Sequence, residues 1–251
     1  MLELKDVFYS YGGNEPAVNR LSFAVEKGEA VGLIGANGAG KSTLMRLIVG
    51  LLGAEGSILV DGLPVERKNL PQIRRKVGFV LQDSDNQMFM PTVYEDMIFG
   101  PLNSGLDMEE AQRRVDGVLE RLDLMPLKHR YNHQISGGEK RMAAIAVILA
   151  MEPEVILMDE PSSALDPMNR RTVIRTINSL PQTKLIASHD LDMILDTCQR
   201  VILLSRGTIV ADGPAEVILR DRALLEANRL ELPFCLQRRR VSSSIFPPDT
   251  V

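Results

Sequence analysis

The feature that most constrains this chain is the glycine-rich segment 35–42, Gly-Ala-Asn-Gly-Ala-Gly-Lys-Ser, which fits the pattern G-x-x-x-x-G-K-[ST]. An apolar run of strand type, residues 30–34, precedes it, and apolar residues at helical spacing follow it between residues 44 and 51. A strand, a glycine-rich loop and a helix in this order form the context in which the pattern binds phosphate groups. A chance glycine-rich turn would lack these flanks, so we interpret the segment as a phosphate-binding loop.

The residue types in this loop suit a nucleotide. Glycine lets the backbone wrap closely around a phosphate where a Cβ would block the approach, and backbone amides at a helix N-terminus supply partial positive charge. Lys41 can reach the terminal phosphates, and the Ser42 hydroxyl can bind Mg²⁺. The motif therefore predicts a nucleoside triphosphate bound together with Mg²⁺.

Composition narrows the classes of protein to consider. The 251 residues suffice for one large α/β domain, and a formal net charge of −4 gives no sign of a nucleic-acid partner. Cys198 and Cys235 lie too far apart for metal-ligand spacing and are expected to be reduced thiols. The longest apolar run, residues 142–151, is far shorter than the ~20 residues that span a bilayer. Any membrane role is therefore expected to come through a partner.

The first sixty residues predict a small antiparallel sheet. Residues 2–8 alternate apolar and polar side chains in part, and residues 21–25 and 57–60 have the character of further short strands. Asp61-Gly62 is a hairpin-type turn. We expect this N-terminal antiparallel β subdomain to pack beside a parallel core.

The rest of the chain predicts an α/β fold with a mostly parallel sheet and helical connections, as in the cores of P-loop nucleotide hydrolases. A helical subdomain is expected to be inserted at about residues 83–150, where residues 109–122 carry one apolar stripe and residues 136–150 are strongly helical. A short helical tail is expected at residues 215–232. The predicted core strands are residues 30–34, 76–81, 154–158 and 184–187, with a hairpin formed by residues 201–204 and 208–211.

Four residues that can carry chemistry directly follow predicted strands: Gly35, Gln82, Asp159 and His189. Ligands of open α/β sheets bind beyond the carboxyl ends of the strands. We therefore expect these four residues to converge on one edge of the sheet.

Two adjacent acids, Asp159 and Glu160, end the buried strand at residues 154–158. Buried strand ends rarely carry adjacent acids without a partner, although a solvated turn is the simpler alternative. Asp159 fits the Mg²⁺ shell, and Glu160 could orient and deprotonate a water molecule. Gln82 could bind Mg²⁺ and that water, and His189 could hydrogen-bond the terminal phosphate. Taken alone, a glutamine after a strand is usually a loop residue and a histidine is usually structural.

The segment Ser136-Gly137-Gly138-Glu139 opens a predicted helix and allows two interpretations. Small residues at a helix N-terminus can form a second anion site, and a second site would serve a nucleotide held by another copy of the chain. Serine followed three residues later by glutamate is equally a capping box. The local pattern leaves both interpretations open.

In their order and spacing, these motifs resemble the nucleotide-binding subunit of ATP-binding cassette transporters over about residues 1–220. Residues 135–139, Ile-Ser-Gly-Gly-Glu, resemble that family's signature LSGGQ, and residues 163–166 resemble its segment that crosses the dimer interface. Tyr11 stands where the family stacks an aromatic ring on adenine. Ile135 and Glu139 replace the Leu and Gln of the signature, and Ser-Ser-Ala-Leu-Asp stands where Thr-x-Gly-Leu-Asp is commoner. These mild departures bear on rate rather than on activity.

The resemblance implies an ATPase that binds ATP and Mg²⁺ and works as a dimer. Each site would join one chain to the signature segment of the other, and closure would move the helical subdomains and the membrane partner with them. The residues implied in catalysis are Glu160, His189 and Gln82, and those implied in binding Mg²⁺ are Ser42, Gln82 and Asp159. The residues implied in nucleotide binding are Tyr11, Gly35, Asn37, Gly38, Ala39, Gly40, Lys41, Ser42, Thr43, Ser136, Gly137, Gly138 and Asp166.

A narrower resemblance points to energy-coupling-factor importers. It rests on residues 82–87 and 91–101, and residues 188–192 and 198–201 look most like the cobalt and nickel branch. It implies a homodimer bound peripherally at the cytoplasmic face of the membrane to a transmembrane coupling protein and a substrate-binding membrane component. Gln87 and its neighbours would line the groove that receives the coupling helix.

Other interpretations stay open. The same group includes importers of biotin and other vitamins. Soluble cassette ATPases of DNA repair carry a long coiled coil between the two halves of the cassette, whereas in this chain only about 53 residues separate Gln82 from Ile135. Soluble cassette ATPases of translation carry two cassettes in one chain, whereas this chain has one. A scaffold for iron–sulfur assembly is a further class. Residues 221–251 are expected to be a short, partly mobile extension, and its arginine triplet at 238–240 could contact anionic lipid.

Overall fold

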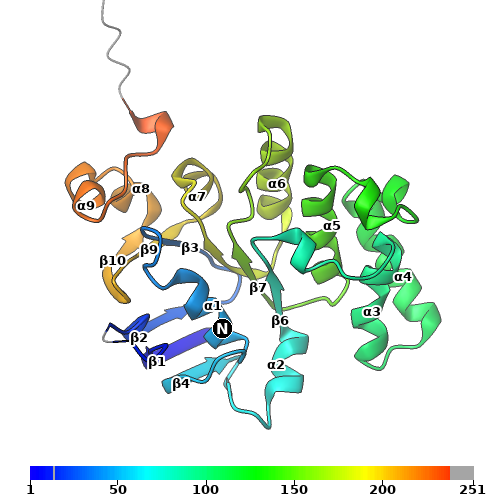
Figure 1. Ribbon diagram of the computed structural model, residues 1–251, viewed down its shortest axis with the longest axis horizontal. Coiled ribbons are helices and arrows are strands. Elements are labelled where there is room, and N and C mark those ends of the chain that lie inside the picture. Colours follow the sequence, from blue (N-terminus) through cyan, green and yellow to red (C-terminus); the bar gives the residue numbers. More distant parts are fainter. Residues whose placement is uncertain (14, 238–251) are drawn as a thin grey trace, which may run out of the picture.

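The computed structural model describes residues 1–13 and 15–237 and contains two β-sheets. The smaller sheet is antiparallel (Figure 1). Its strands lie in the order β2, β1, β4, β5, and their bounds are Val18–Val25, Leu2–Tyr9, Glu55–Val60 and Leu63–Pro64. The Asp61-Gly62 turn joins β4 to β5, where Val60 pairs with Leu63. The predicted N-terminal antiparallel subdomain is therefore confirmed.

The larger sheet is the core of the α/β fold. Five of its six strands are parallel, and only β10 pairs antiparallel, with β9. In sheet order the strands are β10 (Thr208–Pro214), β9 (Arg200–Ser205), β3 (Ala30–Ile34), β8 (Thr183–Ala187), β7 (Val155–Asp159) and β6 (Val77–Val80). The predicted mostly parallel sheet and the terminal hairpin are confirmed.

Helix α1 (Lys41–Ile48) lies between the two sheets, as Figure 1 shows. Its buried residues Leu44 and Leu47 share one hydrophobic core with Leu2 of β1 and Leu157 of β7. Along β7 the side chains alternate, because Ile156 and Met158 belong to the second core on the opposite face. Strand side chains point alternately to the two faces of a sheet, so one buried strand contributes to both cores.

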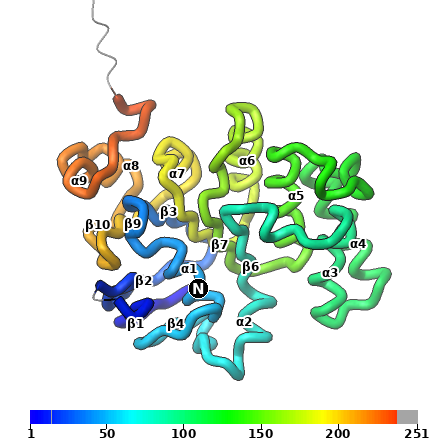
Figure 2. The backbone as a smooth tube through the Cα atoms, in the orientation of Figure 1, coloured from blue at the N-terminus to red at the C-terminus, as the bar shows by residue number. Residues whose placement is uncertain are grey.

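The second core lies under a helical layer. It contains residues of α3 (Val93–Asn103), α4 (Met108–Arg121), α5 (Gly137–Leu149), α6 (Pro167–Ser179) and α7 (Leu191–Thr197). Figure 2 shows α3, α4 and α5 together at one end of the molecule, where the helical insert is predicted. The predicted stripe on α4 is buried at Ala111, Val115, Val118 and Leu119. Four short 3-10 helices are described as well: Ser84–Asn86, Met125–Leu127, Asn132–Gln134 and Phe234–Leu236.

Some expectations differ from the structure. Lys76 belongs to α2 (Leu70–Lys76) rather than to β6, which is the edge strand of the sheet. The expected helical tail is two short helices, α8 (Ala215–Ile218) and α9 (Arg222–Ala227). The chain starts a new helix at Arg222, because the Asp221 side chain accepts a hydrogen bond from the Leu224 amide and caps that helix. Helix α6 was not predicted individually, although Asp166 before Pro167 is a recognisable helix start.

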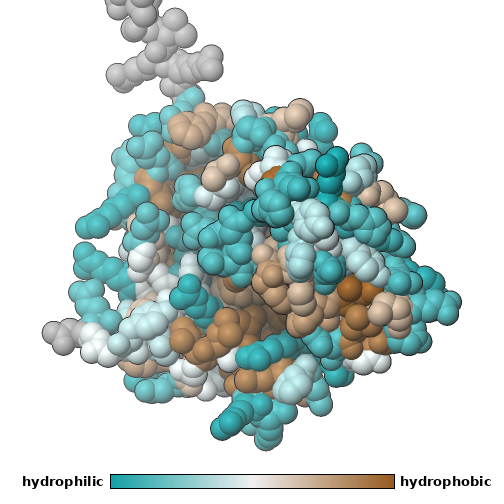
Figure 3. All heavy atoms as spheres, turned by 45° about the vertical axis from the view of Figure 1, so that its right-hand side comes forward, coloured by the Kyte–Doolittle hydropathy of each residue, from teal (hydrophilic) through white to brown (hydrophobic). Residues whose placement is uncertain are grey.

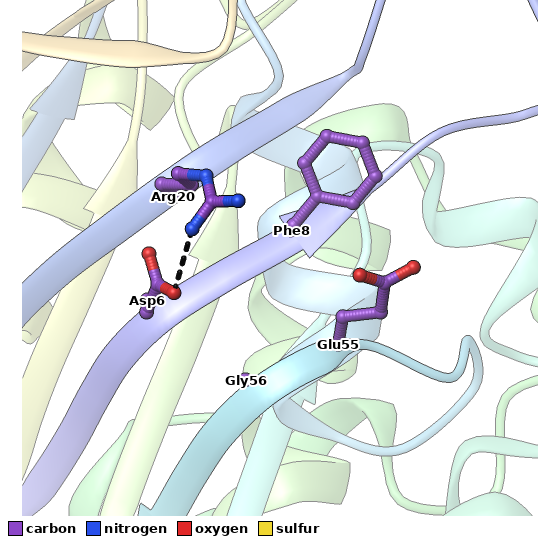
Figure 4. A pocket seen from close by; sticks show the side chains of 5 residues that line it. All are labelled: Asp6, Phe8, Arg20, Glu55 and Gly56. Carbon is purple, nitrogen blue, oxygen red and sulfur yellow. Dashed lines mark hydrogen bonds and ion pairs between the residues drawn. The ribbon is translucent and has the colours of Figure 1, made fainter.

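The antiparallel sheet has a small hollow on its surface (Figure 4). Asp6 and Arg20 form an ion pair at 3.0 Å beside Phe8 and Glu55, and the pairing of β1 shifts register in this region. Both members of the pair are well exposed, so this ion pair contributes little to stability. The residues that line this hollow are different from those of the site described below.

In the described part of the chain, no helix combines the length and apolar character needed to cross a membrane. The arginine triplet at 238–240 and the serine-rich segment after it lie outside the described residues. The division at residue 220 into a cassette and an extension stays a prediction.

Candidate active site

One pocket of about 680 Å³ collects the phosphate loop and the strand ends. This volume lies in the range of sites for small molecules. Gln82 follows β6, Asp159 and Glu160 end β7, and His189 follows β8. The structure thus brings the four strand-end residues to one edge of the sheet. The lining residues are Tyr11, Ala17, residues 35–43, Gln82, Asp159, Glu160, His189, Arg229 and Leu230.

The backbone of the loop leaves space for a phosphate. Gly38 has a φ of +79° with nothing within 4 Å of an added Cβ, so it borders open space. Gly40 has a φ of +104°, and a Cβ there would lie 2.2 Å from the carbonyl oxygen of Ala17. Only glycine adopts this conformation at so close an approach. The loop therefore forms a cradle of phosphate-sized shape directly before α1.

Lys41 supplies the fixed cation of the cradle. Its side chain is buried, and Nζ donates to the carbonyl oxygens of Gly35 at 2.7 Å and Ala36 at 3.3 Å. Burial lowers the pKa of Lys41, while the carboxylates of Glu160 and Asp159 act in the opposite direction. Backbone carbonyl oxygens of the phosphate loop therefore fix the position of the ammonium group.

Asp159 is a buried acid, and one of its carboxylate oxygens is available to bind a metal ion. Among the described residues, its Oδ1 has no hydrogen-bond partner. Burial raises the pKa of Asp159, and the nearby Ser42 hydroxyl opposes this. A buried carboxylate oxygen without a partner is costly, whereas carboxylate, hydroxyl and amide oxygens suit Mg²⁺. Asp159, Ser42 and Gln82 line the same pocket, so their chemistry fits a bound Mg²⁺.

Glu160 is held by the loop that follows β8. Its Oε2 accepts hydrogen bonds from Ser188 Oγ at 3.0 Å and from the backbone amide of His189 at 3.2 Å. The Nδ1 atom of His189 lies 2.7 Å from the same oxygen. Glu160 is 7% exposed and has a φ of +51°, a conformation that is uncommon outside glycine. The network orients one oxygen and leaves Oε1 for other contacts.

Tyr11 lines the pocket beside the first turn of α1. Its hydroxyl lies 3.3 Å from Thr43 Oγ1, and its ring packs edge-to-face against Tyr9 at a centroid distance of 4.9 Å. The ring is 59% exposed. An exposed aromatic ring at this position can stack on a base, as the resemblance implies.

The signature segment does not join this pocket within one chain. Ser136 and Glu139 form a complete capping box at the start of α5. Gly138 packs against Asn169, whose side chain is bound by Asp166, the N-cap of α6. Ser136, Gly137, Gly138 and Asp166 therefore lie apart from the other predicted nucleotide ligands. Their role across a dimer interface stays a prediction.

Sequence reasoning missed the residues that hold Gln82. Buried Arg141 of α5 donates to the carbonyl oxygens of Leu81, at 2.7 Å, and Gln82. Gln87 accepts from the Leu81 amide and donates to the Ala144 carbonyl at 2.7 Å. These bonds tie the loop after β6 to the helix that carries the signature segment. The available sign was a long basic side chain directly before the apolar run of α5, residues 142–149.

A second missed group is centred on Asp190. Its two carboxylate oxygens accept from Arg170 Nε at 2.6 Å and Nη2 at 2.8 Å, and Oδ2 also accepts from Ser162 Oγ at 3.0 Å. Burial raises the pKa of Asp190, but the hydrogen bonds from Arg170, Met193 and Ser162 outweigh it, so the net direction is downward. This group joins the His189 loop to the segment after Glu160.

Comparison with known proteins supports the interpretation of this pocket as a nucleotide site. Residues 18–163 match the family model of the ABC transporter domain. The energy-coupling factor transporter ATP-binding protein EcfA of Methanothermobacter thermautotrophicus is 43% identical over 93% of this chain and 77% of its own length. Among solved structures, cbiO1 of Clostridium perfringens, part of the ABC transporter complex cbiONQ, aligns with a TM-score of 0.80 and 33% identity over 92% of this chain and 95% of its own.

A dimeric ATP-binding cassette in a post-hydrolysis state with ADP and Pi aligns with a TM-score of 0.77 and 28% identity, covering 86% of this chain and 99% of that one. The family match covers more than half of the chain, and it includes the phosphate loop, Gln82 and both acids. The chain therefore belongs to the ABC transporter family, as an ATP-binding and ATP-hydrolysing subunit.

Proposed function

We propose that this chain powers a membrane importer of the energy-coupling-factor type that carries cobalt or nickel ions. The observation that carries the ATPase role is the convergence of Lys41, Glu160 and His189 in the pocket that the phosphate loop lines. The importer type is supported by the relative named EcfA and by the neighbour from the complex cbiONQ. The cobalt or nickel assignment rests on the resemblance of residues 188–192 and 198–201.

The chain's own residues would act on ATP in distinct ways. The loop amides and Lys41 bind the phosphates, and Tyr11 stacks on the base. Glu160 holds a water molecule and removes its proton as the water attacks the terminal phosphate. His189 Nδ1 lies 2.7 Å from that carboxylate and keeps it oriented, and an imidazolium with a proton on each nitrogen would also donate from Nε2 to the phosphate.

Ser42, Gln82 and Asp159 would hold Mg²⁺, because they present oxygen atoms in the same pocket. When bound, the ion neutralises charge on the terminal phosphates. Arg141 fixes the backbone of Gln82 from α5, so a movement of the helical region would be transmitted to this ligand.

A second copy of the chain would complete each site. Ser136 and Gly137 at the start of α5 are exposed, and a Cβ on Gly137 would meet nothing within 4 Å. The N-terminus of a 13-residue helix with open space before it can receive the terminal phosphate of a nucleotide bound to the partner. The capping box keeps this end rigid without occupying that space.

The membrane partner would dock beside Gln87. Phe89 is 65% exposed and Phe99 is 41% exposed, and their rings pack edge-to-face at 5.2 Å. Figure 3 shows apolar side chains gathered on the face that carries the helical region. A pair of exposed aromatic rings is a suitable anchor for an apolar helix.

Purification from membranes tests the proposal. The tagged chain should co-purify with a hydrophobic membrane protein, and cells that express both should accumulate radioactive cobalt or nickel. Glu160→Gln should abolish this uptake without preventing co-purification. Uptake of a vitamin instead of either ion would reassign the substrate, and absence of a membrane partner would refute the importer role.

A further inference from the structure

The chain returns to the active site after α9. Arg229 and Leu230 line the pocket that holds Lys41 and Glu160, although they lie far from both in sequence. Figure 2 shows the segment after α9, in orange, above the loop that precedes α1. The cassette resemblance ends at about residue 220, so none of the motifs described above accounts for these residues.

Specific contacts anchor this returning segment. Leu230 and Leu232 pack against the second hydrophobic core. The backbone amides of Phe234 and Cys235 donate to the two carboxylate oxygens of Asp192, at 2.8 Å and 2.9 Å. Apolar anchors and the Asp192 carboxylate thus hold the segment from 229 to 235 in a defined position, with Arg229 and Leu230 at the pocket.

The backbone at Arg229 forms the C-terminal cap of α9. The Leu230 amide donates to the Leu225 carbonyl at 2.9 Å, and the Arg229 amide donates to the Glu226 carbonyl at 3.1 Å. This pair of bonds is the Schellman motif, whose left-handed residue is usually glycine. Arg229 adopts a φ of +61°, so arginine occupies a position where the backbone favours glycine. The cap itself gives no reason for a guanidinium here.

The guanidinium has no anionic partner among the residues that the structure describes. Arg229 is exposed and forms no ion pair with any acid of residues 1–13 or 15–237. The other charged side chains of the pocket are Lys41, Asp159 and Glu160, together with the imidazole of His189. Without Mg²⁺, one fixed cation thus faces two carboxylates where a polyanion must bind. A second cation would offset this repulsion.

The neighbours of Arg229 identify the part of the pocket at which it lies. It also borders a hollow lined by residues 36–39, and another lined by His189 and Asp190. Tyr11 lines neither of these two hollows. Arg229 therefore borders the part of the pocket formed by residues 36–39 and His189, the groups that face the terminal phosphate in the binding mode proposed above.

We propose that Arg229 is a further nucleotide-binding residue, which donates charge-assisted hydrogen bonds to the terminal phosphate of ATP. Guanidinium groups suit this task, because their planar donors match two phosphate oxygens. The proposal rests on the nucleotide site assigned above and deepens it. It makes the segment after α9 part of the site and lets the chain distinguish ATP from ADP.

Titration of the Mg²⁺-free nucleotides tests this role without any catalytic readout. Arg229→Gly suits the left-handed cap while removing the guanidinium, so its thermal unfolding should match or exceed that of the wild type. Its affinity for ATP should fall about 3- to 10-fold, an effect between those of exposed and buried charge-assisted bonds, and its affinity for ADP should change little. Arg229→Lys should retain part of the preference for ATP.

Arg222→Ala is the matched control, because Arg222 is an exposed arginine at the start of α9, whose far end Arg229 caps, and it lies outside the pocket. It should bind both nucleotides like the wild type. If Arg229→Gly binds ATP normally, or loses ATP and ADP equally, the proposal is overturned while the nucleotide site stands. If the wild type binds neither nucleotide, the site assignment itself fails, and this proposal fails with it.

Discussion

The Nδ1 atom of His189 lies 2.7 Å from Oε2 of Glu160, the oxygen that also accepts the Ser188 hydroxyl hydrogen bond at 3.0 Å. The residues belong to neighbouring strand ends, after β7 and β8. The His189 backbone amide donates to this oxygen as well, at 3.2 Å, so one oxygen takes all three contacts and the other stays free to face a water molecule. The acid and the imidazole therefore form one hydrogen-bonded unit. Substitution of Glu160 should remove the base itself, whereas substitution of His189 should remove a group that orients it.

Glu160→Gln should reduce ATP hydrolysis by about 10²–10⁴-fold, the usual contribution of a positioned general base. The amide keeps the size and one oxygen of the carboxylate, so ATP binding should survive. Steady-state phosphate release and nucleotide titration measure the two effects. If hydrolysis stays near the wild-type rate and His189→Ala abolishes it, His189 rather than Glu160 is the base.

Lys41→Ala should weaken ATP binding by about tenfold or more and abolish hydrolysis, because the buried cation of the loop is lost. Fluorescence titration with ATP checks the affinity. Lys68→Ala removes a lysine whose side chain is 75% exposed and lies outside the pocket, and it should change nothing. Unchanged affinity in Lys41→Ala would refute the phosphate-loop assignment.

Ser136→Arg should prevent ATP-driven dimerisation by placing a bulky cation at the exposed start of α5. The effect should be clearest in the Glu160→Gln background, where hydrolysis no longer reopens the dimer. Sedimentation with and without Mg-ATP measures association. Ser136→Ala is the control: it loses the cap, at a cost of about 1 kcal/mol, but leaves the space open and should still dimerise. Normal dimerisation of Ser136→Arg would leave Ser136 as a helix cap only.

Arg141→Met should lower hydrolysis more than ATP affinity, because it frees the backbone of Gln82 while the phosphate loop is untouched. Two carbonyl oxygens lose a charged donor, so stability should fall by about 1–3 kcal/mol. Urea unfolding and phosphate release test both effects. Lys140→Met, in the neighbouring position on α5, should alter neither strongly, since Lys140 pairs with an exposed acid. Equal loss of binding and hydrolysis in Arg141→Met would contradict a specific role in positioning Gln82.

Asp190→Asn should destabilise the chain by about 1–3 kcal/mol at neutral pH, because the two-bond ion pair with Arg170 is lost. The pKa of Asp190 lies below its ordinary value of 3.8 in the folded state. Its contribution is therefore complete above that value and disappears as pH falls through the lower folded-state pKa. The stability difference, measured by urea unfolding, should be equal at pH 7 and pH 5.5 and should shrink only in stronger acid. A difference that changes between pH 7 and pH 5.5 would contradict this assignment.

Much of the fold follows from local pattern in this chain. Apolar runs such as residues 154–158 specify buried strands, the stripe on α4 specifies a packed helix, and Asp61-Gly62 specifies a hairpin. Chemistry-bearing residues directly after strands also imply their convergence, because parallel strands bring their carboxyl ends to one edge. These features depend on neighbours within a few residues, so periodicity and turn chemistry reveal them.

The sequence by itself thus determined the phosphate loop, the acid pair and the α/β fold, while the tertiary structure decided which groups hold them in place. Arg141 and Gln82 are 59 residues apart, Arg170 and Asp190 are 20 apart, and Asp192 and Phe234 are 42 apart. No local pattern links such pairs, because their contacts exist only after the helices have packed on the sheet. Arg229 shows the same limit: its left-handed backbone is a helix cap, and only the folded chain places its cation beside the phosphate loop.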